Sequence, residues 1–289
     1  MTRSDGDRDM RHAWKRLLAA TLMFAGTASP VAADRAPGGA GLPAGSSYVS
    51  LGSSYAAGAG IGPTAANSPG HCNQSVNNYP RLVAARLGLT LVDASCGGAT
   101  TAHLLRPWRE LPARLDSVTP TARLVTVTIG GNDVHLVGDL AASECRKTDG
   151  SNVPRCVLPP APTEAEWGDL ERNLHEIARE VRRRAPDARL VFVDYLNMLP
   201  RGAPCAAVPF DRAGIARARA TFRHLAEVTA RVARNEHALL IPAGKLSTGH
   251  DACSAAPWAV GRTPSGAPWH PTAAGHAAIA RELTRVLRT

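Results

Sequence analysis

Hydrophobic residues recur along the chain in short, nearly continuous runs that alternate with longer amphipathic segments. The clearest run covers residues 123–129, and its β-branched residues are typical of a strand that is buried on both faces. Similar runs predict strands over 47–52, 90–94, 188–195 and 237–242. Apolar positions at helical spacing predict helices over 79–87, 163–184 and 211–235, and a last helix from about Thr272 to the end of the chain.

Strands that alternate with helices at this spacing predict an α/β protein, in which helices cover both faces of a parallel sheet. We expect a three-layer α/β/α sandwich around a mainly five-stranded parallel sheet. Three of the strands end in small residues, and Ser54, Gly98 and Asn132 follow them. Because ligands bind beyond the carboxyl ends of strands in such sheets, these residues should gather there. The segment that carries Cys145 and Cys156 is predicted to be a long loop.

The first residues have the features of an export signal. Residues 1–33 combine a basic start, an apolar run too short to span a bilayer comfortably, and small residues before Asp34, so we expect a signal peptide that is cleaved there. The Gly-, Pro- and Ala-rich residues 34–46 are predicted to be a flexible leader. Residues 47–289 are predicted to form a single domain, and the mature protein is expected to be extracellular.

Charge and cysteine content narrow the class of protein. The formal net charge is +9, and it becomes +7 without the five basic and three acidic residues of 1–33. This charge is compatible with transient contact with anionic lipid or cell-wall polymer, or with solubility alone. All six cysteines follow the predicted signal and no two form a C-x-x-C pair, which favours three disulfides over a redox or zinc motif. The count alone leaves fifteen pairings open.

Four residues in separate segments suggest acyl transfer by a serine. Ser54 follows the first strand and is the candidate nucleophile, and His270, held between Trp269 and Pro271, is the candidate base. A backbone N–H at Gly98 and the side chain of Asn132 would donate hydrogen bonds to a developing oxyanion.

These residues resemble the four sequence blocks of the SGNH superfamily of GDSL-type esterases and lipases, in the same chain order. The likeness extends from about residue 48 to 275 and is greatest with the secreted actinobacterial branch. It implies a flavodoxin-like SGNH hydrolase fold, an acyl-enzyme on Ser54 with His270 as base, and an oxyanion hole made by Ser54, Gly98 and Asn132. It implies neither cofactor nor metal. It also implies three sequential disulfides, which are Cys72–Cys96, Cys145–Cys156 and Cys205–Cys253.

Two positions differ from the family pattern. Ser53 stands where the family usually has an aspartate, and Ala267 stands where an aspartate usually orients the histidine. Members without that aspartate use a backbone carbonyl, so we predict that the carbonyl of Ala267 accepts a hydrogen bond from His270. A neutral carbonyl orients the ring better than it stabilises the imidazolium. Activity is therefore expected to be lower, or to need a higher pH, than with a full triad.

Other classes fit the sequence less well. An α/β-hydrolase needs Gly-x-Ser-x-Gly and a dinucleotide-binding protein needs Gly-x-Gly-x-x-Gly, and neither motif is complete after the first strand. A zinc protease needs a second histidine after His175 and Glu176, and the sequence has none at that spacing. The remaining alternative is a weak or inactive SGNH-fold protein that binds cell wall or carbohydrate. For the enzyme we expect a small-molecule or lipid ester as substrate, no nucleic acid and no obligate protein partner. Acyl-chain length and oligomeric state stay open.

Overall fold

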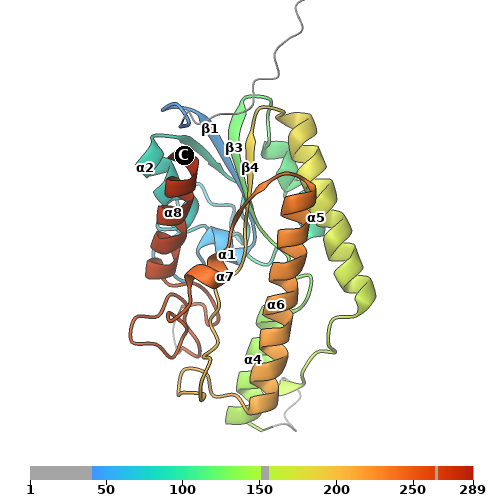
Figure 1. The fold of residues 1–289 in the computed structure, drawn as a ribbon, viewed down its shortest axis with the longest axis vertical. Helices are drawn as coiled ribbons and strands as arrows, with labels where there is room; N and C mark the ends of the chain where they lie inside the picture. Colours follow the sequence, from blue (N-terminus) through green and yellow to red (C-terminus); the bar gives the residue numbers. More distant parts are fainter. Residues whose placement is uncertain (1–40, 151–155, 264–265, 289) are drawn as a thin grey trace, which may run out of the picture. The chain divides into compact units, whose positions relative to one another are not determined.

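Five parallel strands form one sheet in the order β2-β1-β3-β4-β5, of which β1, β3 and β4 are labelled in Figure 1. The computed structural model describes residues 41–150, 156–263 and 266–288, so the predicted signal peptide lies outside the described residues. The strands are β1 (Ser47–Gly52), β2 (Thr90–Asp93), β3 (Ala122–Thr128), β4 (Arg189–Val193) and β5 (Leu239–Ile241). The predicted five-stranded parallel sheet is confirmed, with strand ends that differ from the prediction by at most two residues.

Helices cover both faces of this sheet, as the pattern predicted. In Figure 1, α2 (Tyr79–Leu87) and α8 (Ala273–Arg288) lie together on one side of the strands. The other side carries α5 (Glu164–Arg184) and α6 (Arg212–Asn235), with α3 (Thr101–Leu105) packed against α5. A hydrophobic cluster fills the space between the sheet and each helix layer. The short elements are α1 (Ser54–Ala57), a 3-10 turn (Arg114–Ser117) and α7 (Ala243–Leu246).

Local sequence explains where the long helices begin. Thr163 and Glu166 form a capping box in which each side chain bonds the other's backbone N–H, and α5 starts directly after Thr163. The side chain of Asp211 accepts from the N–H of Gly214 at 2.7 Å and caps α6. Asn78 caps α2 in the same way, and Gly88 ends it in a left-handed conformation.

One segment was predicted wrongly. Residues 136–148, expected to lie in a long loop, form the helix α4 (Leu136–Thr148), which packs against α6. Leu136 and Leu140, one helical turn apart, are fully buried in the core. Asp139 on the same helix pairs with Arg217 of α6 through two hydrogen bonds of 3.1 Å. Burial and this ion pair therefore stabilise a helix whose first residue follows His135, which makes no side-chain cap.

The end of the predicted leader contacts the turn between α2 and β2 and the hydrophobic cluster beside it. Gly45 donates its N–H to the carbonyl of Gly88 at 2.7 Å, and Leu42 packs against the hydrophobic cluster of the α2 and α8 face. Among the described residues no helix is both long enough and apolar enough to cross a bilayer.

Three disulfides join neighbouring cysteines along the chain. They are Cys72–Cys96, Cys145–Cys156 and Cys205–Cys253, the pairs implied by the family resemblance. Cys72–Cys96 joins the loop before α2 to the end of β2, next to Gly97, whose N–H donates to the carbonyl of Cys72 at 3.0 Å. This disulfide therefore borders the segment that contains Gly98.

The order of the strands determines where a site forms. The chain moves outward from β1 to β2 and then returns past β1 to β3, so the direction of winding reverses between β1 and β3. The last residues of these two strands, Gly52 and Thr128, are paired in register. Ligands bind at such a switch point, beyond the carboxyl ends of the strands. Ser54 and Asn132 follow the two strands directly and lie at this point.

Candidate active site

Ser54 and His270 are in direct contact, although 216 residues separate them in sequence. The Oγ of Ser54 lies 2.8 Å from Nε2 of His270. Ser54 is the first residue of α1, immediately after β1, and His270 comes from the loop before α8. The structure thus brings together the predicted nucleophile and the predicted base at hydrogen-bond distance.

The opposite nitrogen of the imidazole bonds the backbone, but not at the predicted residue. Nδ1 of His270 lies 2.8 Å from the carbonyl oxygen of Pro268, so the prediction of Ala267 is corrected by one residue. With Nδ1–H donating to this carbonyl, Nε2 is left to accept the proton of Ser54. Among the described residues no carboxylate bonds either ring nitrogen; Asp251 instead accepts from the N–H of Cys253.

The loop before His270 explains the change of acceptor. Trp269 has a left-handed backbone with φ of +62°, which costs an L-residue roughly 1–2 kcal/mol. This turn brings the carbonyl of Pro268 to the imidazole. Several contacts hold it: Tyr55 donates its hydroxyl to the Trp269 carbonyl at 2.7 Å, the Trp269 indole N–H donates to Glu144 at 3.1 Å, and the indole is fully buried.

The environment of His270 favours its neutral form. The residue is 8% exposed, and burial lowers its pKa below the ordinary value of 6.5, while the bond to the Pro268 carbonyl offsets part of the shift. The ring of Tyr55 packs on it with centroids 5.1 Å apart. A neutral imidazole is the form that accepts a proton. The lowered pKa therefore predicts a base that is unprotonated at a lower pH than an unperturbed histidine, which is opposite to the expected need for a higher pH.

Gly98 and Asn132 lie beside this pair. Together with Ser54 and His270 they line one cavity of about 470 Å³. Gly98 has φ of +79°, a conformation that glycine adopts without strain. The side-chain amide of Asn132 donates one N–H to the carbonyl of Ala99 at 2.8 Å, which orients the amide and leaves its second N–H for another acceptor. All four sequence-predicted residues thus border the same cavity.

Asp133 attaches the Asn132 loop to the Gly98 loop. Its carboxylate accepts the N–H of Thr101, the first residue of α3, at 3.1 Å and also accepts the Thr101 hydroxyl. Burial raises the pKa of Asp133, and the bonds from Thr101 counteract that shift. This role of Asp133 was not predicted from the sequence. An aspartate adjacent to Asn132, with a threonine at a helix start, was the available signal.

Tyr195 supports the loop that carries Asn132 through a hydrogen bond to the preceding residue, Gly131. Its hydroxyl accepts the N–H of Gly131 at 2.9 Å, and a Cβ at Gly131 would lie 2.9 Å from the Tyr195 ring, so only glycine fits. Burial raises the pKa of Tyr195 to about 12, which keeps the hydroxyl protonated. Ser53, in the position where an aspartate was expected, lies 3.4 Å from this hydroxyl. Sequence reasoning missed Tyr195 because it lies 64 residues beyond Gly131.

Charged and aromatic groups form the outer wall of the cavity. Trp108 stacks on His103 with centroids 4.1 Å apart, and the guanidinium of Arg109 lies 5.2 Å from the Trp108 ring centroid. Among the described lining residues, Arg109 is the one side chain with a permanent charge. A guanidinium therefore borders the cavity, and the carboxylate of Glu110, which lies 2.8 Å from His71, is close enough to interact with it.

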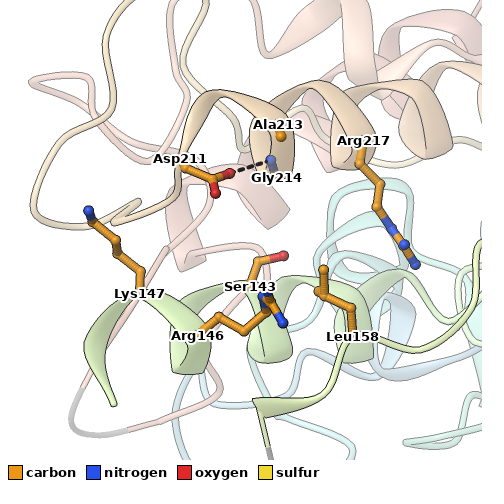
Figure 2. Close-up of a pocket in the computed structure, with 8 residues that line it drawn as sticks. All are labelled: Ser143, Arg146, Lys147, Leu158, Asp211, Ala213, Gly214 and Arg217. Atoms are coloured by element: carbon orange, nitrogen blue, oxygen red, sulfur yellow. Dashed lines mark hydrogen bonds between the residues drawn. The ribbon is translucent and has the colours of Figure 1, made fainter. Parts of the chain in front are cut away.

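A second hollow has a serine but no histidine among its described lining residues. It measures about 420 Å³ and lies between α4 and the start of α6 (Figure 2). Its carboxylate, Asp211, already caps α6 through Gly214, and its described lining residues include no histidine beside Ser143.

Two groups of possible metal ligands among the described residues each contain two cysteines that are joined in a disulfide, so those sulfurs are already bonded.

Comparison with known proteins identifies the family. The model of the GDSL-like lipase/acylhydrolase family matches residues 50–278. The chain belongs to this family. It is 30% identical over 269 residues to Lipase 2 of Streptomyces coelicolor, covering 83% of this chain and 85% of that protein. It is also 30% identical over 231 residues to a lipase of Streptomyces rimosus, covering 79% and 81%.

Solved structures agree with this family assignment. The extracellular lipase of Streptomyces rimosus superposes with a TM-score of 0.68 at 27% identity, over 84% of this chain and 100% of that one. Phospholipase A1 of Streptomyces albidoflavus shares the fold, with a TM-score of 0.69 at 23% identity over 85% and 100%. As a member of this family, the present chain is a carboxylic ester hydrolase that acts on small-molecule or lipid esters.

Proposed function

We propose that the hydrolase works through a Ser54–His270 dyad whose histidine is oriented by the carbonyl of Pro268. The observation that carries this proposal is the 2.8 Å contact between Ser54 Oγ and His270 Nε2, in a cavity shared with Gly98 and Asn132. In acylation, Nε2 takes the proton of Ser54 as Oγ attacks the ester carbonyl carbon. The protonated imidazole then gives this proton to the departing alcohol, and the acyl group stays on Ser54.

The oxyanion is held by three N–H donors. These are the backbone N–H groups of Ser54 and Gly98 and the free N–H of the Asn132 amide, whose other N–H is fixed on Ala99. In deacylation His270 takes a proton from water as the water oxygen attacks the acyl carbon, and it returns the proton to Ser54. The products are a carboxylic acid and an alcohol.

Replacement of Ser54 by alanine tests this mechanism. Ser54→Ala should reduce kcat for p-nitrophenyl butyrate to background, with little change in thermal stability, because Ser54 is partly exposed and the change removes one oxygen atom. Ser53→Ala is the matched control, since Ser53 precedes the nucleophile and its hydroxyl lies 3.4 Å from that of Tyr195, while its backbone bonds are unaffected by the change. Ser53→Ala should keep most activity. Substantial turnover by Ser54→Ala would remove Ser54 from the mechanism.

We propose that the natural substrates are lipid esters, and that esters with a phosphate on the alcohol side are among them. The names of the relatives, lipase and phospholipase A1, support the lipid class. Arg109 at the cavity wall supports the phosphate, because a guanidinium binds phosphate through paired hydrogen bonds. Phospholipid and neutral glyceride with the same acyl chains provide the test. Arg109→Gln should raise KM for the phospholipid alone, whereas Arg106→Gln, an exposed neighbour outside the cavity lining, should not.

We also propose export by way of residues 1–33, with a leader over 34–46 and a hydrolase domain over 47–289. The even cysteine count, the three disulfides and the extracellular lipase among the relatives support it. The mature charge of +7 suits transient contact with an anionic lipid surface or cell wall. N-terminal sequencing of protein from the culture medium should begin at Asp34. Intact protein that remains in the cells would contradict export.

A further inference from the structure

A cavity of about 700 Å³ lies outside the candidate active site, where β4 and β5 end beside α6. Its volume falls in the range that holds drug-sized ligands. The residues that line it and those that line the Ser54 cavity are different sets. Tyr195 separates the two regions, since it lines this cavity and bonds Gly131 through its hydroxyl. An occupant would therefore not compete with a substrate at Ser54.

The walls of this cavity are amphipathic. Phe222, Leu240 and Pro242 provide an apolar side, whereas Arg201, Arg219, Arg223 and Lys245 provide four cations. Such a combination suits a ligand with a hydrocarbon body and an anionic head.

The carboxylates of the cavity are already engaged. Glu227 lies 3.9 Å from Arg223 in a pair one helical turn apart. Asp194 accepts the N–H of Gly244 at 2.8 Å, and burial raises its pKa to about 7, so near neutral pH its negative charge is only partial. The net charge of the lining is therefore positive.

Arg219 marks the point at which an anion would bind. Its Nη2 atom is buried and has no hydrogen-bond partner among the described residues. A buried guanidinium N–H without an acceptor is costly, and more so for a charged group than for a neutral one. Arg219 lines this cavity and also a neighbouring one of about 360 Å³, so its guanidinium borders open space, and an anionic oxygen placed beside it would supply an acceptor.

We propose that this cavity binds an alkyl carboxylate, with the carboxylate on Arg219 and the chain along Phe222 and Leu240. The choice of carboxylate rests on the ester hydrolase function, because hydrolysis of a lipid ester releases this class of molecule. The cavity would thus hold the acid product at a second site, apart from the nucleophile.

The test measures binding of sodium decanoate, below its micelle concentration, to protein whose Ser54 has been blocked with an organophosphonate. Isothermal titration calorimetry should show saturable binding at one site. Arg219→Gln should weaken it by about tenfold or more, since a charge-assisted hydrogen bond is lost. Arg234→Gln, an exposed arginine of the same helix outside the cavity lining, is the matched control and should bind as the parent does.

Two further ligands, used with the chain that carries no substitution, test whether binding depends on the carboxylate. Decanol should bind at least about tenfold more weakly than decanoate. Decyl phosphate, compared at the same concentrations, should bind no more tightly than decanoate. Tighter phosphate binding would overturn the carboxylate assignment. Equal binding of decanol and decanoate, equal loss in Arg219→Gln and Arg234→Gln, or loss of binding when Ser54 is blocked would overturn the second site. Failure of the phosphonate to react would instead count against the proposed function.

Discussion

Tyr195 should be a positioning residue for the oxyanion donors, and Tyr195→Phe tests this role. The substitution keeps the buried ring and removes the hydroxyl that accepts the Gly131 N–H at 2.9 Å. A buried N–H without an acceptor costs about 1–3 kcal/mol, so the free energy of unfolding should fall by about 2 kcal/mol. Gly131 immediately precedes Asn132, so the Asn132 donor should become less well placed.

The effect on catalysis should be smaller than removal of a donor. Deleting one oxyanion donor commonly costs 10²–10³ in kcat, whereas a loosened donor keeps part of its bond. A loss of about 1.4 kcal/mol of transition-state stabilisation corresponds to roughly tenfold. We therefore expect kcat of Tyr195→Phe for p-nitrophenyl butyrate to fall by roughly tenfold with KM little changed, because the interaction strengthens in the transition state.

Tyr79→Phe is the matched control for this experiment. Tyr79 is also buried, and its hydroxyl pairs with Thr128 at 2.8 Å on the other face of the sheet. It should lose a similar amount of stability in urea unfolding but keep its kcat. Wild-type kcat in Tyr195→Phe, or an equal loss of kcat in both variants, would refute the positioning role.

Three other changes, in pH, at the Cys72–Cys96 disulfide and at Gly98, test the site. The acid limb of kcat/KM should have its midpoint below pH 6.5, because burial lowers the pKa of His270 and activity is lost only as pH falls through that lowered value. The stability linked to neutral His270 should be lost in the same direction, since the unfolded chain binds the proton more tightly. Replacing Cys72 and Cys96 by serine should cost about 3 kcal/mol of stability and lower kcat, because the bridge spans 24 residues and borders Gly98. Gly98→Ala should lower both kcat and stability, the latter by about 1 kcal/mol, because φ is +79°.

Each of these outcomes has a clear contradiction. A pH–rate profile with its acid midpoint at or above 6.5 would indicate a carboxylate beside His270. Unfolding curves and kcat values for the serine double variant that match the parent would show that the disulfide does not support the Gly98 loop. An unchanged kcat in Gly98→Ala would indicate that the backbone there does not approach the oxyanion.

Local sequence was enough to predict most of the fold. The run that became β1 and the helix Tyr79–Leu87 have the predicted ends, because a short run that ends at Gly52, an Asn cap and a stop at Gly88 act within a few residues. The helix Leu136–Thr148 was missed because its stability comes from distant partners. It lacks a side-chain cap, and it is held by burial of Leu136 and Leu140 and by the pair between Asp139 and Arg217.

In the candidate site, too, features set by local sequence were predicted and features set by distant contacts were not. The chain order of Ser54, Gly98, Asn132 and His270 was readable because each follows a strand or precedes a helix. The acceptor for His270 was misplaced by one residue, because the left-handed turn at Trp269 depends on contacts with Tyr55 and Glu144 from distant segments. The support from Tyr195 depends on β4 lying beside β3, which no local pattern encodes.

The most direct test of the account is to find which residue an organophosphonate labels. Intact mass and peptide mapping should place one phosphonyl group on Ser54 in the parent and in Ser53→Ala. Ser54→Ala should carry no phosphonyl group. His270→Ala should be labelled at Ser54 at a much reduced rate. These results follow from a hydroxyl activated by the imidazole 2.8 Å away. A label on another serine, or labelling of Ser54→Ala at the parental rate, would contradict the Ser54–His270 mechanism.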